Sequence, residues 1–245
     1  MYLGTAVNVA TVLLGTVVGV AVGGRIPDRL RATITAALGL LTGALAIREV
    51  GATDEFIVVL AAVLIGSVIG EFARIEQGLE ALGIWLQSRL TSEAKRFDVE
   101  FPEASIPEAA GNQQNRFAEG FVLASLVFVI GPLTILGSIN DGLGDPELLL
   151  VKAGLDGFAS IAFASIYGWG VGLAAVTVLV VQGTIALASS ALDGVLTDAM
   201  IDALASTGGI LLLGISLRLL DLKHVRVANM LPALVLAPLF VWWFG

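Results

Sequence analysis

Two charged residues one helical turn apart are the first candidates for chemistry in this chain. Lys152 and Asp156 are four residues apart inside the apolar window Leu148–Tyr167, so a helix places both on one face. Charged groups are costly in apolar surroundings, and each one therefore needs a reason to be there. Two interpretations stay open. The residues form an internal ion pair with no further role, or Asp156 binds a cation or proton with an affinity that Lys152 tunes.

Three uncharged polar residues could add ligands to such a site. Asn8 and Gln182 each fall in an apolar run, and Ser160 follows Asp156 by four residues, on the same helical face. Their side-chain oxygens are neutral ligands of the kind that a hard cation accepts. The alternative is structural, because polar side chains commonly form hydrogen bonds between packed apolar helices.

Other groups suited to catalysis or metal binding are scarce. The chain has one histidine and no cysteine, which excludes the usual multi-histidine and thiolate metal sites. It also lacks a nucleotide-binding loop, a Gly-x-Ser-x-Gly turn and a His-Glu-x-x-His pair. The sequence therefore predicts neither an enzyme nor a bound cofactor, and it gives no support for ATP-driven pumping by this chain alone.

The composition is typical of a protein embedded in a bilayer. Of the 245 residues, 57% are hydrophobic and only 14% are charged, and the mean hydropathy is +0.93. A soluble domain has about 25% charged residues, so a water-soluble globular enzyme and a disordered chain are excluded. A net charge of −8 with thirteen lysines and arginines leaves no basic surface for nucleic acid. The expected partner is the lipid bilayer.

Eight apolar windows divide the chain, and we expect each of them to cross the membrane as a helix. The windows are Leu3–Gly23, Ala32–Ile47, Phe56–Ile75, Phe117–Ile139, Leu148–Tyr167, Val171–Ala191, Met200–Leu220 and Val227–Phe244. A spanning helix needs about 18–20 residues, so the second window, which is shorter, must be tilted or broken. The sequence thus predicts an all-α polytopic membrane protein, with a single transmembrane domain over residues 1–245.

The positions of the basic residues predict the orientation. If the N-terminus lies outside, eleven of the thirteen lysines and arginines fall in inner loops: Arg25, Arg29, Arg31, Arg74, Arg89, Lys95, Arg96, Arg116, Arg218, Lys223 and Arg226. The positive-inside rule then places both termini outside a cytoplasmic membrane. Four residues near the inner interface are expected to form a charge network rather than a catalytic set: Glu71, Arg74, Arg116 and Glu119.

The segment Glu76–Asn115 is the one sizeable hydrophilic stretch, and the orientation places it in the cytoplasm. Its first part has apolar residues at helical spacing with charged residues between them, which indicates an amphipathic helix lying on the membrane or on the bundle. A helix that merely extends the third span is the alternative. The stretch Phe101–Asn115, which carries two prolines and a glycine, is expected to be a loop.

Glycines mark three places where a helix could turn or break. Ile130-Gly131-Pro132 and Gly208-Gly209 are possible breaks inside spans, and broken helices expose amide or carbonyl groups that can bind ions. Packing glycines are the alternative. The glycines between Gly168 and Gly172 favour a plain turn between two spans.

A weak internal repeat relates the two ends of the chain. At an offset of 170 residues, Ile26–Arg48 matches Leu196–Arg218 with four identities in 23 positions. The first and sixth spans run in opposite directions, so spans one to three and six to eight would form an inverted repeat. Inverted repeats recur in secondary transporters, which bind their substrates near the membrane midplane.

Four runs of sequence carry a resemblance to a known family. Gly120–Ser138, Lys152–Gly157, Gln182–Thr184 and Val225–Pro232 resemble the bacterial inner-membrane family called domain of unknown function 554. The likeness extends over nearly the whole chain, beginning with Gly4–Asn8. It implies a small bacterial multi-span protein, and it supplies no substrate. It also implies that the positions of Asn8, Asp156 and Gln182 belong to the family pattern.

These observations favour a small secondary transporter or ion-coupled carrier of the bacterial cytoplasmic membrane. The expected ion or substrate site consists of Asp156, Lys152, Gln182, Asn8 and Ser160. The expected partners are a small solute or ion and a second copy in a homodimer. Two alternatives stay open: a passive channel, and a non-transporting scaffold or assembly protein that docks partners on the helix Glu76–Lys95.

Overall fold

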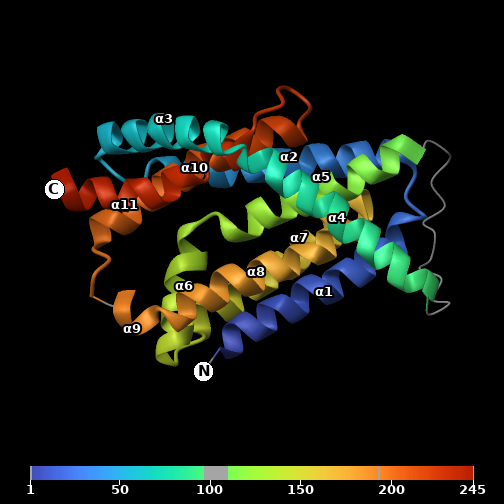
Figure 1. The fold of residues 1–245 in the computed structure, drawn as a ribbon, viewed down its shortest axis with the longest axis horizontal. Coiled ribbons are helices and arrows are strands. Elements are labelled where there is room, and N and C mark those ends of the chain that lie inside the picture. Colours follow the sequence, from blue (N-terminus) through green and yellow to red (C-terminus); the bar gives the residue numbers. More distant parts are fainter. Residues whose placement is uncertain (1, 97–109, 193, 245) are drawn as a thin grey trace.

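The computed structural model describes residues 2–96, 110–192 and 194–244, and this part of the chain is helical without strands. Figure 1 shows the arrangement of the elements, whose bounds are α1 Leu3–Gly23, α2 Asp28–Val50, α3 Phe56–Ala73, α4 Ile75–Arg96, α5 Ala110–Val129, α6 Pro132–Leu143, α7 Glu147–Tyr167, α8 Gly170–Leu187, α9 Ser189–Leu192, α10 Asp198–Leu219, the 3-10 helix η1 Val227–Met230 and α11 Pro232–Phe244.

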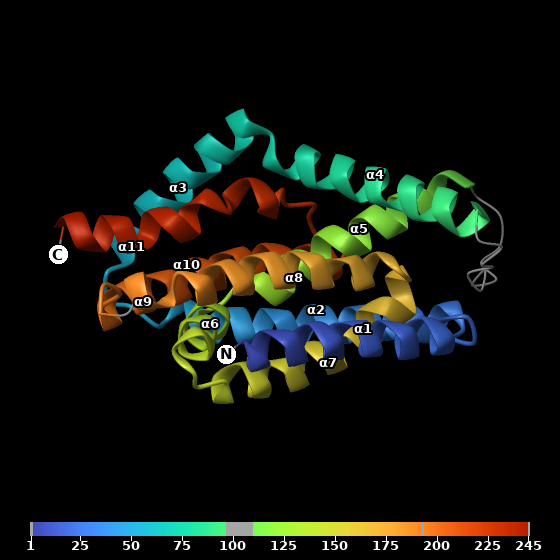
Figure 2. The same ribbon diagram turned by 60° about the horizontal axis from the view of Figure 1, so that its bottom comes forward.

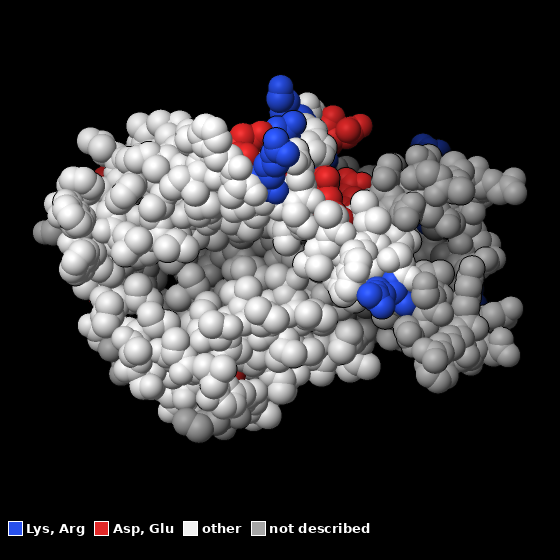
Figure 3. Space-filling model, in the orientation of Figure 1, with Lys and Arg blue, Asp and Glu red and all other residues white. Residues whose placement is uncertain are grey.

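The chain is an all-α polytopic membrane protein, as the sequence predicts. Within the described residues, seven helices are long and apolar enough to cross a membrane, and the bent pair α5–α6 makes an eighth span if it is counted as one. Figure 3 shows one face of the molecule. Its charged side chains gather around the α3–α4 junction and the loop after α10, whereas most of the described surface is uncharged. Such a surface suits contact with lipid.

Of the two expectations for the second span, that it is tilted or that it is broken, the break is wrong. Helix α2 is continuous over 23 residues, because polar residues at both ends extend the apolar window. Thr33 and Thr35 fit into this helix because each hydroxyl donates to the backbone carbonyl four residues earlier, at 3.0 Å in both cases. A hydropathy window records only the apolar middle of such a helix.

Of the two interpretations of Ile130-Gly131-Pro132, a helix break and packing glycines, the structure shows the break. Helix α5 ends at Val129, and α6 begins at Pro132 with a bend of 66°. Pro132 has no amide hydrogen to continue the helix, and Gly131 has a φ of 137°, which favours glycine. The Thr134 hydroxyl donates to the carbonyl of Phe128 at 3.1 Å, which satisfies one of the carbonyls that the break exposes.

The other two glycine sites behave differently. Helix α10 is continuous through Gly208-Gly209, so no break occurs there. These glycines serve packing, because a methyl group on Gly209 would lie 2.6 Å from the backbone nitrogen of Val50 in α2. The expected turn between spans is confirmed: α7 ends at Tyr167, and Gly168 has a φ of 72° before α8 begins.

Helix α4 is the predicted amphipathic helix. It does not extend α3 in a straight line, because Arg74 joins the two with a φ of 54° and Figure 2 shows α4 turning away at this point. One face packs on α5, where Gly83 lies against Phe121. The opposite face exposes Trp85, whose ring lies 5.4 Å from the guanidinium carbon of Arg89.

The predicted loop Phe101–Asn115 is corrected in part. Its residues 101–109 lie outside the described part of the chain. Residues 110–115 are helical and form the first turns of α5, so the expectation is wrong for them. These residues are mostly polar and show no apolar pattern at helical spacing. For that reason the sequence predicts a loop there.

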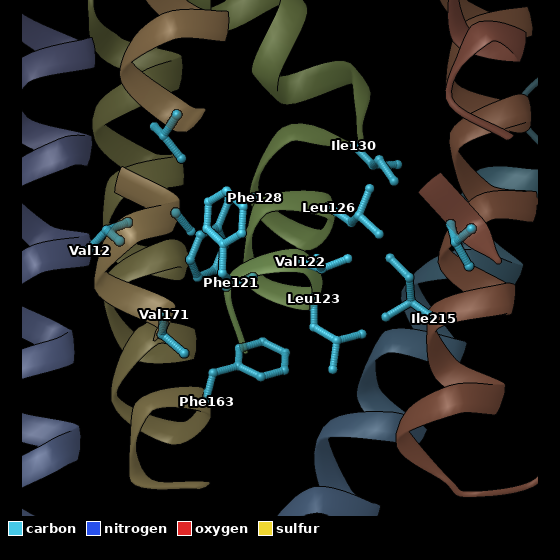
Figure 4. Packing of buried hydrophobic residues seen from close by; sticks show 14 of the residues in the cluster. Val12, Phe121, Val122, Leu123, Leu126, Phe128, Ile130, Phe163, Val171 and Ile215 are labelled. Atoms are coloured by element: carbon cyan, nitrogen blue, oxygen red, sulfur yellow. The ribbon is translucent and has the colours of Figure 1, made fainter. Parts of the chain in front are cut away.

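Helix α5 lies at the centre of the molecule, between two groups of helices. Helices α7 and α8 pack on one side of it, with α1 behind them, and α10 and α2 lie on the other side (Figure 4). Its side chains from Phe121 to Leu126 are buried, and Figure 4 shows Phe121 and Phe128 toward the first group and Leu123 and Leu126 toward Ile215 of α10. A helix segment that is apolar on every side is typical of a buried position.

Helices α1 and α7 approach each other closely along a row of glycines. A methyl group on Gly19 would lie 2.8 Å from the Cβ of Ala164, and one on Gly23 would lie 2.7 Å from the carbonyl oxygen of Ser165. Small residues permit such close contact between backbones. In lipid the hydrophobic effect does not hold helices together, so this close packing stabilises the pair instead. This pairing fixes α1 against the face of α7 that carries the charged pair.

The contact between α2 and α10 is reciprocal at the offset of 170 residues. A methyl group on Gly39 would lie 2.8 Å from Leu220 and 3.2 Å from Leu219. At this offset Gly39, Leu220 and Leu219 correspond to Gly209, Val50 and Glu49. Gly209 does lie against Val50 and Glu49. Two-fold related surfaces make such reciprocal contacts. The inverted repeat as a whole stays a prediction.

Candidate functional site

The charged pair of α7 lies together inside the bundle. Lys152 Nζ is 2.5 Å from Asp156 Oδ2, and the two side chains are 7% and 9% exposed. The spacing of four residues places both groups on the buried face of α7, where α1 covers them. The arrangement combines an anion and a cation that have lost nearly all contact with solvent.

Asn8 of α1 completes this cluster. Its Nδ2 donates to Asp156 Oδ2 at 3.0 Å, and the residue is fully buried. Its other amide atom, Oδ1, has no hydrogen-bond partner among the described residues. A buried oxygen without a partner is unusual, because leaving it so costs about 1–3 kcal/mol. The cluster of Lys152, Asp156 and Asn8 therefore holds one unused oxygen acceptor.

Ser160 lies beside the cluster in a different role from the one expected. Its hydroxyl donates to the backbone carbonyl of Asp156 at 2.7 Å, in the pattern of serine in helices, and makes no bond to the carboxylate. A methyl group on Gly15 of α1 would lie 2.9 Å from the Ser160 Cβ, so this residue also forms part of the close helix contact.

Gln182 is fully buried in α8, and the structure does not join it to the carboxylate. Neither its amide oxygen nor its amide nitrogen has a partner among the described residues. Gly172, on the same helix, packs against Thr16 of α1, which runs in the opposite direction. Gln182 lies ten residues further along, about 15 Å at about 1.5 Å per residue, and so beside the N-terminal part of α1.

The sequence analysis misses Asp141, which falls between the predicted spans Phe117–Ile139 and Leu148–Tyr167. The residue is 1% exposed at the end of α6, and its carboxylate accepts three hydrogen bonds from the start of α1. The donors are the Gly4 and Thr5 amides at 2.9 and 3.0 Å and the Thr5 hydroxyl at 2.9 Å. Asp141 thus caps α1 about one turn before Asn8. No local pattern indicates this contact, because the residues are 136 positions apart.

The end of the bundle at which α4 begins holds a second buried ion pair. Glu76, at the start of α4, is 3% exposed, and its Oε1 lies 2.9 Å from Arg218 Nη1 of α10. Its Oε2 accepts the Ala228 amide at 3.0 Å, and its own amide donates to Asn229 Oδ1 at 2.8 Å. Glu76 therefore ties α4 to α10 and to η1.

The predicted charge network near the inner interface forms with only two of its four members. Glu119 lies 3.7 Å from Arg218, and Glu71 pairs with Arg226 at 2.6 Å. Arg74 and Arg116 make no ion pair within the described residues. Arg74 instead occupies the junction of α3 and α4.

A cavity of about 500 Å³ opens between the ends of four helices. Its lining comes from α2, α5, α7 and α10 and includes Arg31, Arg116, Glu119, Tyr167 and Leu219. Asp156 does not line it, and lies eleven residues before Tyr167 on α7, about 16 Å at about 1.5 Å per residue. The charged pair is therefore closed off from this cavity.

Comparison with known proteins gives a family and no activity. A family model described as "Protein of unknown function (DUF554)" matches residues 3–242. The "Uncharacterized protein YqgA" of Escherichia coli (strain K12) is 30% identical over 245 residues, 99% of this chain and 98% of that protein. The "Uncharacterized membrane protein YdfK" of Bacillus subtilis (strain 168) is 35% identical over 130 residues, 53% of this chain and 57% of that protein.

No solved structure matches the chain. The family model covers almost every described element, from the first residue of α1 to within α11. The chain belongs to the DUF554 family.

Proposed function

We propose that this membrane protein is a small secondary carrier of the cytoplasmic membrane, coupled to a cation or proton that binds at Asp156. The observation that carries the proposal is the buried cluster of Lys152, Asp156 and Asn8 with its unused amide oxygen. An ion pair that served stability alone would gain nothing from a third residue with an unsatisfied acceptor. Buried ionisable residues within membrane helices commonly mark ion pathways.

Two features favour a carrier over a passive channel. Asp156 does not line the inner cavity, so an ion bound there is enclosed on the inner side, as alternating access requires. The span formed by α5 and α6 is broken by 66°, and discontinuous helices are typical of secondary transporters. The substrate that accompanies the ion is a small solute. The homodimer stays a prediction.

The predicted inverted repeat supports the same class of protein. Its three pairs of equivalent helices are α1 with α8, α2 with α10 and α3 with α11, and the helices of each pair pack against each other. Figure 2 shows that the members of a pair run in opposite directions. A two-fold axis in the membrane plane produces such antiparallel pairs. In carriers with this symmetry, one half of the protein moves against the other, so that the binding site opens alternately to the inside and to the outside.

The proposed orientation places both termini outside, and a labelling experiment tests it. The chain has no cysteine, so Thr53→Cys and Ser88→Cys each introduce a single thiol, in the α2–α3 loop and in α4 respectively. We expect a membrane-impermeant thiol reagent to label the first variant in intact cells, and the second only after the cells are opened. Labelling of Ser88→Cys in intact cells would reverse the orientation.

Flux through sealed vesicles tests the carrier itself. Purified protein is reconstituted with a pH-sensitive dye inside, and a Na⁺ gradient is applied from outside. We expect the wild-type protein to move protons in response, and Asp156→Asn to reduce this flux to the level of protein-free vesicles, because the amide has no charge to bind a cation. Glu147→Gln, an exposed acid on the same helix, is the matched control and should keep full flux. Full flux in folded Asp156→Asn would remove Asp156 from the mechanism.

A further inference from the structure

We propose that the cavity of about 500 Å³ binds a small zwitterion, with the anionic group of the ligand at Arg116 and its ammonium group at Asp221. As the class of the solute that accompanies the ion, this zwitterion rests on the carrier function proposed above. Its binding is measured without flux, so the two proposals fail separately. None of the residues that line the cavity belongs to the cluster of Lys152, Asp156 and Asn8.

Two opposite charges without ion-pair partners line this cavity. Arg116 lies in the first half of α5, and Asp221 follows the end of α10 by two residues. Neither side chain makes an ion pair or a hydrogen bond within the described residues. They also do not pair with each other, so their charged atoms lie more than 4.0 Å apart. The cavity therefore offers one positive and one negative group with space between them.

The charge of the lining favours a zwitterion over a simple ion. The cavity has the guanidinium groups of Arg31 and Arg116. It also has the carboxylates of Glu119 and Asp221, which oppose an anion just as the guanidinium groups oppose a cation. Glu119 already lies 3.7 Å from Arg218, and Arg31 donates to a backbone carbonyl at 3.2 Å. Arg116 and Asp221 are thus the two charges that a ligand would complete.

The rest of the lining suits the carbon chain of a small solute. Ile166, Leu219 and Leu220 supply apolar surface from α7 and from the end of α10. The Tyr167 hydroxyl makes no hydrogen bond within the described residues and can donate to an anionic group. Tyr167 is fixed against α5, because a methyl group on Gly120 would lie 2.5 Å from its Cβ. The volume of about 500 Å³ falls within the range of about 300–1,000 Å³ that is typical of small-molecule sites.

Two kinds of molecule carry this pair of charges. An amino acid joins a carboxylate to an ammonium group, and the headgroup of phosphatidylethanolamine joins a phosphate to an ammonium group. A guanidinium group binds the oxygens of carboxylate and phosphate alike, so either anionic group suits Arg116. The shared chemistry is the zwitterion, and soluble probes distinguish its two sources.

Calorimetry on the purified protein in detergent tests this site. The probes are the common amino acids and glycerophosphoethanolamine, which is the soluble headgroup of the lipid. For an amino acid that binds, the controls are the same molecule without its ammonium group and without its carboxylate, which for leucine are isocaproate and isoamylamine. We expect at least one amino acid to bind, and each of its two analogues to bind about tenfold or more weakly, because each leaves one charge of the cavity without a partner.

Two variants assign the two charges. Asp221→Asn should abolish the preference for the amino acid over the analogue without an ammonium group, and Arg116→Gln should abolish the preference over the analogue without a carboxylate. A purely structural role of either residue would weaken the binding of all three molecules equally. Lys223→Gln and Arg25→Gln are the matched controls and should bind like the wild type, because both residues are exposed and neither lines the cavity. The melting temperature shows whether each variant is folded.

Three results would overturn the zwitterion site: no binding of any probe, a singly charged analogue that binds as tightly as the amino acid, or a full preference kept by folded Asp221→Asn or Arg116→Gln. Glycerophosphoethanolamine that binds more tightly than every amino acid would assign the site to a lipid headgroup and overturn its role for the solute of the carrier. If no probe binds but Asp156→Asn abolishes flux in vesicles, the carrier function stands without this site. Unchanged flux in Asp156→Asn overturns the carrier function instead and leaves the measured binding in place.

Discussion

Lys152→Met and Asp156→Leu are each expected to lower the free energy of unfolding by about 3–5 kcal/mol, whereas the double variant loses far less. Each single change leaves a charged or polar group that is more than nine-tenths buried without its partner, 2.5 Å away in the native protein. The double change replaces the pair with apolar side chains of similar size. Melting temperature and denaturant unfolding in detergent measure all three variants.

The same variants separate a structural pair from a transport site. The double variant should be stable and inactive in the vesicle assay, which a purely structural pair does not predict. Glu147→Gln, an exposed acid on α7, is the control and should change stability by less than about 1 kcal/mol. If the stability losses of the two single variants simply add up in the double variant, Lys152 and Asp156 do not stabilise each other as a buried pair.

Glu76→Ala is expected to be as costly, at about 3–5 kcal/mol, because it removes the nearer carboxylate of buried Arg218 and leaves only Glu119, 3.7 Å away. Arg218 is 7% exposed, and Glu76 also accepts the amide of Ala228, which would lose its partner. Thermal unfolding measures the loss. Faster proteolysis of α4 should accompany it, because Glu76 ties this helix to α10 and η1.

An exposed pair in the same region provides the control for Glu76→Ala. Arg226 and Glu71 are 2.6 Å apart, and their side chains are 60% and 56% exposed. Solvent screens such a pair, so Arg226→Gln should cost less than about 1 kcal/mol. If Glu76→Ala and Arg226→Gln lowered the free energy of unfolding equally, burial of the Glu76–Arg218 pair would not determine its contribution to stability.

Features that depend on local spacing could be predicted from the sequence. The interval of four residues between Lys152 and Asp156 places both groups on one helical face, and the structure joins them. The break at Gly131-Pro132 follows from the missing amide hydrogen of proline. The apolar windows predict the positions of the membrane-spanning helices, because a helix needs a certain length of apolar chain to cross the bilayer.

Features that depend on contacts across the chain could not be predicted. The role of Asp141 requires the end of α6 to meet the start of α1, and Glu76 requires α4 to meet α10 and η1. For the glycines at 208 and 209 the sequence leaves both a helix break and a packing contact open, and the close approach of α2 shows that they form a packing contact. The sequence analysis groups Gln182 with Asp156 because both are polar residues in apolar helices. That shared property does not determine the distance between the two side chains.

Tracer counterflow tests the central claim, that Asp156 binds the ion of a carrier, most directly. Vesicles are loaded with unlabelled Na⁺, the membrane potential is clamped at zero, and radioactive Na⁺ is added outside at low concentration. We predict that tracer accumulates transiently in wild-type vesicles, because a carrier exchanges one ion for another. Asp156→Asn vesicles should show none. Tracer that equilibrates without an overshoot in wild-type vesicles, or an overshoot of full size in Asp156→Asn, would contradict the claim.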